Sequence, residues 1–189
     1  MQARFKLFIF SAFLLTLSIG NNALAISALT SNAAESFVSS LTDVNMLASE
    51  MKQDGKDNFF EANNEPVPGE KFEPYSGALP ELKKQYPAEY KKLGNIIENH
   101  GFASQESWAS TGDKVMLAYI ASKMPIPAAA AMPQIPAGME HLMPPEAKAE
   151  MAKGLAALKT IRDVPQAHKD IVAPLIPQID QWIAAQSAE

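Results

Sequence analysis

Apolar residues recur at intervals of three and four in several separate stretches of this sequence, and no run alternates β-branched with polar residues. Intervals of three and four are the repeat of an α-helix that buries one face, whereas a half-buried strand repeats every second residue. The first such stretch contains Phe37, Leu41, Val44, Ala48 and Met51. The pattern therefore predicts an all-α fold, built as a single small domain of four to five helices.

The periodic stretches place these helices at about residues 33–52, from 80 or 87 to 100, 105–124, 146–162 and from 165 onward. Asn32 and Ser104 are suited to cap the first and third helices, because their side-chain oxygens can accept bonds from free backbone N–H groups. Gly101 is suited to end the second helix, since glycine takes up the left-handed conformation there without strain. Gly112 lies on the apolar stripe of the third helix, and we expect another backbone to approach it closely.

Prolines shape the last helix. Asp163 is suited to cap it, and Pro165 is suited to be its first residue. Pro174 and Pro177 fall within its apolar pattern, and each removes a backbone donor and clashes with the preceding turn. The sequence therefore predicts either a kink at these prolines or two short helices in place of one.

Two long proline-rich connections, residues 56–79 and 125–145, separate the helices. Their prolines, glycines and asparagines argue against a continuous helix. The first connection also carries four aromatic residues, Phe59, Phe60, Phe72 and Tyr75. Because disordered linkers are poor in aromatic residues, we expect much of this connection to pack against the helices.

The N-terminal segment has the three parts of a secretory signal peptide. Arg4 and Lys6 precede an apolar run over residues 7–19, and small residues stand at Ala23 and Ala25. The apolar run is short for a membrane span and lacks a basic flank after it. We therefore expect residues 1–25 to be removed by cleavage after Ala25, and residues 26–189 to form the helical domain. The expected location is the periplasm, with release into the medium as the alternative.

The composition argues against several classes of function. The chain has no cysteine, which excludes thiol catalysis and disulfide bonds. It has 16 basic and 21 acidic residues, and the signal peptide contains two of the basic ones, so the remaining domain carries a formal charge of −7. An acidic chain is a poor partner for nucleic acids or anionic membranes. Phosphate-binding, dinucleotide-binding and zinc-protease motifs are missing, so we predict no cofactor.

Met139, His141 and Met143 place two thioethers around one imidazole within the second connection. Thioether ligands favour Cu(I), and alternate residues of an extended backbone point to the same side. Methionine is also a common packing residue, and proline and alanine surround this cluster. We expect a loop that docks on the helices, with a periplasmic Cu(I) or Ag(I) site as the alternative hypothesis.

His100 lies at the end of the second predicted helix, where a histidine can bond the last carbonyls or interact with the helix dipole. The alternative is a small hydrolase in which His100 lies in a pocket within reach of a carboxylate and a hydroxyl. His168 has no partner at metal-ligand spacing, so we expect a surface or half-buried residue. Trp108 and Trp182 lie on apolar stripes and are predicted to anchor the core.

No catalytic residue, metal site or cofactor is predicted on the main interpretation, although enzymatic activity stays open. The working hypothesis is an exported, soluble helical protein that acts as a non-enzymatic binding or accessory protein in the periplasm. Its partner, a protein or a small molecule, is not identified by the sequence. The argument is negative, because a site assembled from distant residues leaves no local motif.

Overall fold

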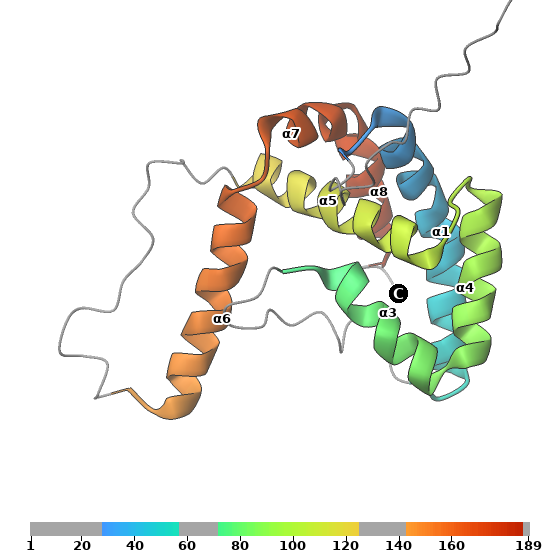
Figure 1. The fold of residues 1–189 in the computed structure, drawn as a ribbon, viewed down its shortest axis with the longest axis horizontal. Helices are drawn as coiled ribbons and strands as arrows, with labels where there is room; N and C mark the ends of the chain where they lie inside the picture. The colour runs from blue at the N-terminus through green and yellow to red at the C-terminus, as the bar shows by residue number, and fades with distance from the viewer. Residues whose placement is uncertain (1–27, 57–71, 125–142, 187–189) are drawn as a thin grey trace, which may run out of the picture.

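The computed structural model describes residues 28–56, 72–124 and 143–186, and all regular secondary structure in these ranges is helical. The predicted all-α fold and single small domain are confirmed (Figure 1). The described elements are α1 (Ser31–Gln53), α3 (Pro74–Gln85), α4 (Pro87–Asn99), α5 (Gln105–Lys123), α6 (Pro145–Arg162), α7 (Gln166–Val172), the short 3₁₀ helix η2 (Ala173–Leu175) and α8 (Ile176–Gln186). The described residues form more helices than the four to five predicted, because two of the predicted helices are each divided.

Helix α5 lies at the centre of the fold and contacts α1, α3, α4, α6 and α7 (Figure 1). Its buried residues lie on several sides of the helix, and many of them are small, including Ala109, Gly112 and Ala118. Small residues allow neighbouring helices to approach closely on more than one face. Ser104 caps its start as predicted, since the Ser104 hydroxyl accepts a bond from the backbone N–H of Ser107.

Three aromatic rings form the centre of the core. Phe37 from α1, Tyr75 from α3 and Trp108 from α5 contact one another, with ring centroids 5.3, 5.5 and 5.4 Å apart. The Trp108 indole N–H donates to the Ser40 hydroxyl at 2.9 Å, and that hydroxyl donates to the carbonyl of Phe37 at 2.7 Å. The Trp108 indole N–H and the Ser40 hydroxyl are therefore paired, and the prediction of Trp108 as a core anchor is confirmed.

Gly112 lies directly beneath this aromatic cluster. A Cβ atom at Gly112 would stand 2.4 Å from Cε2 of Phe37 and 3.1 Å from Cδ2 of Tyr75. The predicted close approach at Gly112 is therefore present, but the prediction that a second backbone makes it is wrong. An aromatic side chain, rather than a second backbone, occupies the space that a larger residue would need.

The start of α1 also differs from the prediction. Thr30, rather than Asn32, is the capping residue, and its hydroxyl accepts a bond from the backbone N–H of Ala33 at 3.2 Å. Thr30 has the extended backbone of a capping residue, whereas Asn32 already belongs to the helix. The helix therefore begins two residues earlier than its apolar stripe indicates.

The predicted connection over residues 56–79 is too long at its C-terminal end, because helix α3 already begins at Pro74. The Asp113 carboxylate of α5 accepts bonds from the backbone N–H groups of Tyr75 and Ser76, at 2.7 and 3.3 Å. These bonds replace a local cap at Glu73, whose side chain makes none. Burial raises the pKa of the Asp113 carboxyl above its ordinary range, although the backbone donors oppose this rise.

The predicted second helix is divided at Tyr86. Pro80 lies inside α3 rather than at a helix start, and α4 begins at Pro87. Tyr86 has φ −130° and ψ 63°, outside the helical region. A residue that precedes proline is disfavoured in the helical conformation, so the break falls where this steric rule places it.

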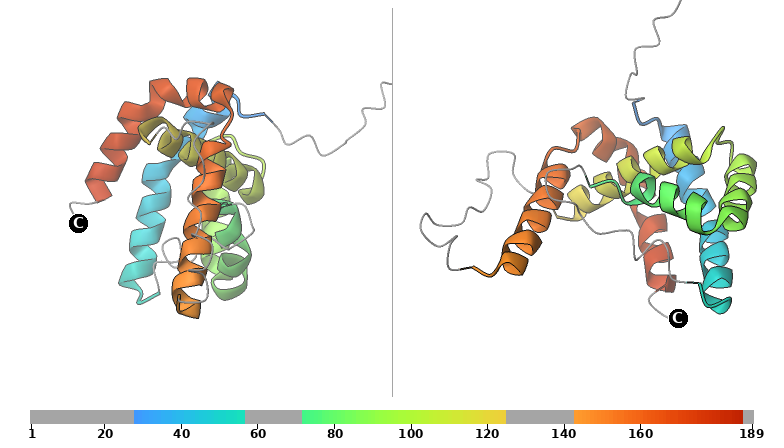
Figure 2. Two further views of the ribbon diagram at one scale, coloured as in Figure 1. Left: turned by 90° about the vertical axis from the view of Figure 1, so that its left-hand side faces the viewer. Right: turned by 60° about the horizontal axis from the view of Figure 1, so that its bottom comes forward.

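The last predicted helix is divided as well. Asp163 ends α6 instead of capping the next helix, and Pro165 occupies the capping position of α7. Pro174 lies in η2 and Pro177 is the second residue of α8. Two short helices therefore form, since proline is tolerated in a first turn where its missing N–H has no helical partner. Figure 2 shows α7 and α8 running in different directions on either side of this turn.

The aromatic residues at the end of the first connection pack on the helices, as expected. Tyr75 packs against the main core, and Phe72 joins a second apolar cluster formed by Leu117, Ala121 and Ile161. This second cluster attaches α6 to the C-terminal half of α5 (Figure 1). Phe59 and Phe60 lie outside the described residues, as does most of the connection over 125–145.

An ion pair joins the end of α1 to the start of α4. The Lys56 ammonium donates to the buried Glu89 carboxylate at 2.6 Å and to the exposed Asp54 carboxylate at 3.1 Å. The bond from Lys56 is the largest of the influences that hold the pKa of the Glu89 carboxyl below its ordinary value of about 4.5. The charged carboxylate is therefore the form that the folded protein prefers.

The Glu89→Gln variant is expected to lose a pH-dependent part of the free energy of unfolding. Because the folded state lowers the pKa of Glu89, the contribution of its carboxylate is fully present above the unfolded pKa and is lost as the pH falls through the folded pKa. The difference in stability between wild type and variant should thus shrink below a pH of about 4.5. Chemical denaturation over a pH series measures this difference. Glu98→Gln, an exposed site on the same helix, is the control, and an unchanged gap at low pH would contradict the assignment.

Candidate functional site

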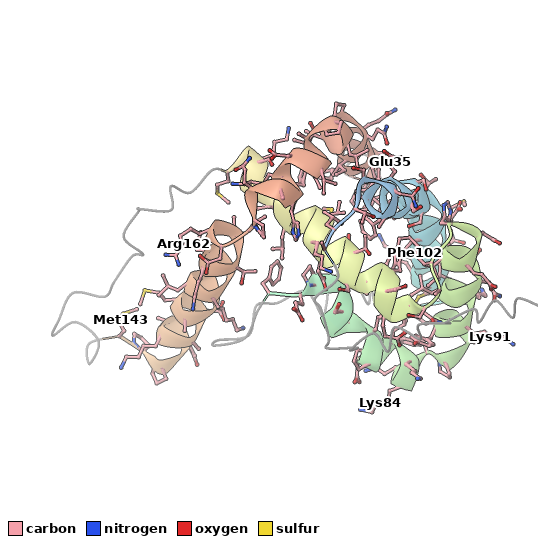
Figure 3. All side chains as sticks on the ribbon, turned by 45° about the horizontal axis from the view of Figure 1, so that its top comes forward. Glu35, Lys84, Lys91, Phe102, Met143 and Arg162 are labelled. Carbon is pink, nitrogen blue, oxygen red and sulfur yellow. The ribbon has the colours of Figure 1, made fainter. Side chains whose placement is uncertain are left out.

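His100 is the capping residue at the C-terminal end of α4. Gly101 follows with φ +84°, in the left-handed region, and confirms the predicted end of this helix. Phe102 is then buried in the corner between α4 and α5, as Figure 3 shows. The tight reversal of the chain at Gly101 leaves the His100 side chain at the edge of the contact between α4 and α1.

The His100 imidazole bonds two side chains of α1. Its Nδ1 atom lies 3.0 Å from the Ser39 hydroxyl, and its Nε2 atom lies 2.8 Å from Oδ2 of Asp43. Ser39 and Asp43 are four residues apart, so they lie on one face of the helix. Bonding of the ring to the last carbonyls of its own helix, one of the two structural roles predicted, is corrected, since both ring nitrogens bond α1. We call these three residues the His100 cluster.

The His100 cluster has two hydrogen-bond arrangements. The single Ser39 hydroxyl proton can point to the carbonyl of Ser36 at 2.9 Å or to Nδ1 of His100 at 3.0 Å. In the second arrangement Nε2–H donates to Asp43, which gives the order hydroxyl, imidazole, carboxylate. This order places a base beside a nucleophile and an orienting carboxylate behind the base. In the first arrangement both ring nitrogens donate, and the cluster only connects the two helices.

The His100 cluster is open to solvent. Ser39 is exposed, and the side chains of His100 and Asp43 keep 19% and 44% of their surface accessible. A hollow of about 320 Å³ lies nearby, between α4 and the start of α5, but none of the three residues lines it. Ser39 is in the interior of α1, where backbone N–H groups are engaged within the helix. Helix α1 therefore offers no free backbone donor beside Ser39 for a developing oxyanion.

The hydrolase hypothesis had two requirements, and the structure fulfils one of them. A hydroxyl and a carboxylate lie within hydrogen-bond reach of His100, as that hypothesis required. The surrounding pocket that it also required is not formed by the hollow next to α4. Neither Ser39 nor Asp43 was identified as a candidate from the sequence. Their spacing of four residues was the signal available, but serine and aspartate at this spacing are common on solvated helix faces.

The metal hypothesis falls largely outside the described residues. Met139 and His141 are among the undescribed ones, whereas Met143 is a half-buried residue just before the start of α6 (Figure 3). Within residues 28–56, 72–124 and 143–186, no three His, Asp or Glu side chains gather to hold a metal ion. The alternative of a Cu(I) or Ag(I) site formed by Met139, His141 and Met143 stays a prediction.

The remaining candidates have structural surroundings. His168 is half-buried in α7, and burial, helped by nearby Lys114, lowers the pKa of its imidazole. Trp182 packs against the main core from α8, in agreement with its predicted role. Its indole N–H is buried and has no hydrogen-bond partner among the described residues. Buried indole groups usually have one, so this atom is an exception among the buried side-chain atoms that the structure describes.

Comparisons of the chain with protein-family models, with curated proteins and with solved structures found no match. In the part of the chain that the structure describes, none of the helices has the length and apolar character needed to cross a membrane. The function is therefore argued from the residues and their geometry.

Proposed function

We propose that this chain is an exported helical protein that acts in the periplasm as a non-enzymatic binding or accessory protein. Export rests on the N-terminal sequence, where a basic start, an apolar run and small residues before Ala25 fit a cleaved signal peptide. Binding rests on one observation, the incomplete cover of α6.

Helix α6 carries an apolar row that is only half covered. Met151, Leu155 and Leu158 follow one another at intervals of four and three, and all three keep intermediate exposure. Ile161, near the C-terminal end, is the one buried residue of this 18-residue helix. By contrast, α1 is buried at regular intervals from Ala34 to Met51. An amphipathic helix gains stability mainly by covering such a row, so α6 retains apolar area for a partner.

The chemistry of the row defines the kind of partner. Thioether and branched aliphatic side chains favour an apolar small molecule or the apolar face of a peptide. Burial of apolar surface contributes about 25 cal/mol per Å², so covering one large side chain supplies about 1 kcal/mol or more. No cofactor or reactive group is needed for this role, which agrees with the lack of cofactor motifs in the sequence.

The test uses protein purified from the periplasm and measured by native mass spectrometry. The expected result is the mass of residues 26–189 together with the additional mass of a bound apolar molecule or peptide. Leu155→Glu should abolish the additional mass, because a carboxylate in the row is costly to cover. Lys159→Glu, an exposed site of the same helix, should retain it. Circular dichroism checks that both variants are folded.

Three outcomes of this measurement decide between the hypotheses. Retention of residues 1–25 would contradict export by cleavage after Ala25. Processed protein without any bound mass, and without affinity for apolar probes, would contradict the binding role. Bound copper or silver that disappears in His141→Ala would instead support the metal site with Met139, His141 and Met143.

A further inference from the structure

We propose that Ser39 is a nucleophile activated by His100, and that it accepts acyl groups from small activated esters that approach from solvent. This inference goes beyond the binding role, because it concerns the His100 cluster on α1 and α4 rather than the apolar row of α6. It follows from the order of the three side chains and from the exposure of the serine.

Each side chain of the cluster has the position that its role requires. Ser39 is an exposed residue, and its hydroxyl oxygen lies 3.0 Å from Nδ1 of His100, which is the reach of a general base. The Asp43 carboxylate lies 2.8 Å from Nε2, so it fixes the ring orientation and holds the proton on the nitrogen that faces away from Ser39. Nδ1 is then the acceptor nitrogen for the serine proton. The two helices hold this geometry because α1 and α4 pack together.

The chemical step is an acyl transfer. The Ser39 oxygen bonds to the carbonyl carbon of an aryl ester while its proton moves to Nδ1 of His100. The bond between that carbon and the aryl oxygen then breaks, and the proton on Nδ1 neutralises the departing phenolate. With a sulfonyl fluoride the serine oxygen bonds to sulfur, the sulfur–fluorine bond breaks, and fluoride leaves as the proton passes through Nδ1 to water.

The surroundings set the size of the effect. A positioned general base accelerates such steps by about 10²–10⁴-fold. An oxyanion-hole donor supplies about a further 10²–10³-fold in hydrolases, and α1 has no free backbone donor next to Ser39. The expected behaviour is therefore formation of a covalent adduct on Ser39 without rapid turnover. Because Ser39 is exposed and does not line the hollow beside α4, small electrophiles should react irrespective of their side groups.

The test treats the folded chain with phenylmethanesulfonyl fluoride and locates the sulfonyl group by peptide mass mapping. One sulfonyl group on Ser39 is expected. Ser122, whose hydroxyl donates to the Ala118 carbonyl of its own helix at 2.7 Å, serves as the internal control and should stay unmodified. His100→Gln should slow the reaction by about 10²-fold or more, and added imidazole should restore part of the rate. Asp43→Asn should give a smaller decrease.

Two results would overturn the proposal. One is wild-type protein without a sulfonyl group on Ser39 after prolonged exposure to the reagent. The other is an equal labelling rate in wild type and His100→Gln, which would show that the serine reacts without the imidazole. Circular dichroism checks that the variants are folded, and the Asp43→Asn variant keeps the test decisive if His100→Gln does not fold.

Discussion

Replacement of Trp108 by alanine is expected to lower the free energy of unfolding by about 3–5 kcal/mol. The Trp108 side chain is fully buried and contacts the rings of Phe37 and Tyr75, so its removal opens a cavity between three helices. The Ser40 hydroxyl would also lose the indole donor that it accepts from at 2.9 Å. Equilibrium unfolding in urea or guanidinium chloride measures the change.

Trp182→Ala is the matched control for this measurement. Trp182 is half-buried on α8 and its indole N–H has no partner among the described residues, so the same truncation removes less buried area and no hydrogen bond. A clearly smaller loss is expected. Equal losses at the two sites, or a loss below about 1.5 kcal/mol for Trp108→Ala, would contradict the central role of the aromatic cluster.

Replacement of Gly112 by alanine is expected to destabilise the fold by about 1–3 kcal/mol, even though alanine is the better helix former. The added methyl group would stand 2.4 Å from Cε2 of Phe37. The Phe37 ring cannot move aside freely, because it is fully buried and packed against Tyr75 and Trp108. Thermal and chemical unfolding of the variant measure the effect.

Gly154→Ala gives a control of opposite sign. Gly154 is an exposed residue of α6, and a Cβ atom there would meet nothing within 4 Å. The substitution should therefore stabilise the protein by about 0.5–1 kcal/mol, through the lower conformational entropy of the unfolded chain. The same substitution thus has opposite effects in two helices, and stabilisation by Gly112→Ala would show that Phe37 has room to shift.

The helical repeat predicted the fold class and most helix positions, because it reports which face of each segment is buried. It failed where a helix depends on a distant residue. Helix α3 begins inside a segment rich in proline and glycine, and the Asp113 carboxylate that accepts from Tyr75 N–H is separated from it by 38 positions. The Glu73 side chain makes no capping bond, so the residues next to this helix start contain no capping pattern from which it could be predicted.

The His100 cluster could not be predicted for a related reason. His100 is 61 positions from Ser39 and 57 from Asp43, so their contact depends on how α1 packs against α4. The sequence places His100 at a helix end and gives the four-residue spacing of the other two. It does not give the rotation of either helix about its axis, and that rotation decides which polar residues meet at the edge of an apolar contact.

The bond from Tyr75 to Asp113 has a consequence for the order in which the chain can assemble. Proteins are synthesised from the N-terminus, and their early segments leave the ribosome first. The first turn of α3 is therefore available before the carboxylate that caps it, and Phe37 is available before the indole that completes its aromatic contacts. The core contacts of α1 and α3 therefore cannot be completed until α5 has been synthesised, which couples folding of this domain to the synthesis of its central helix.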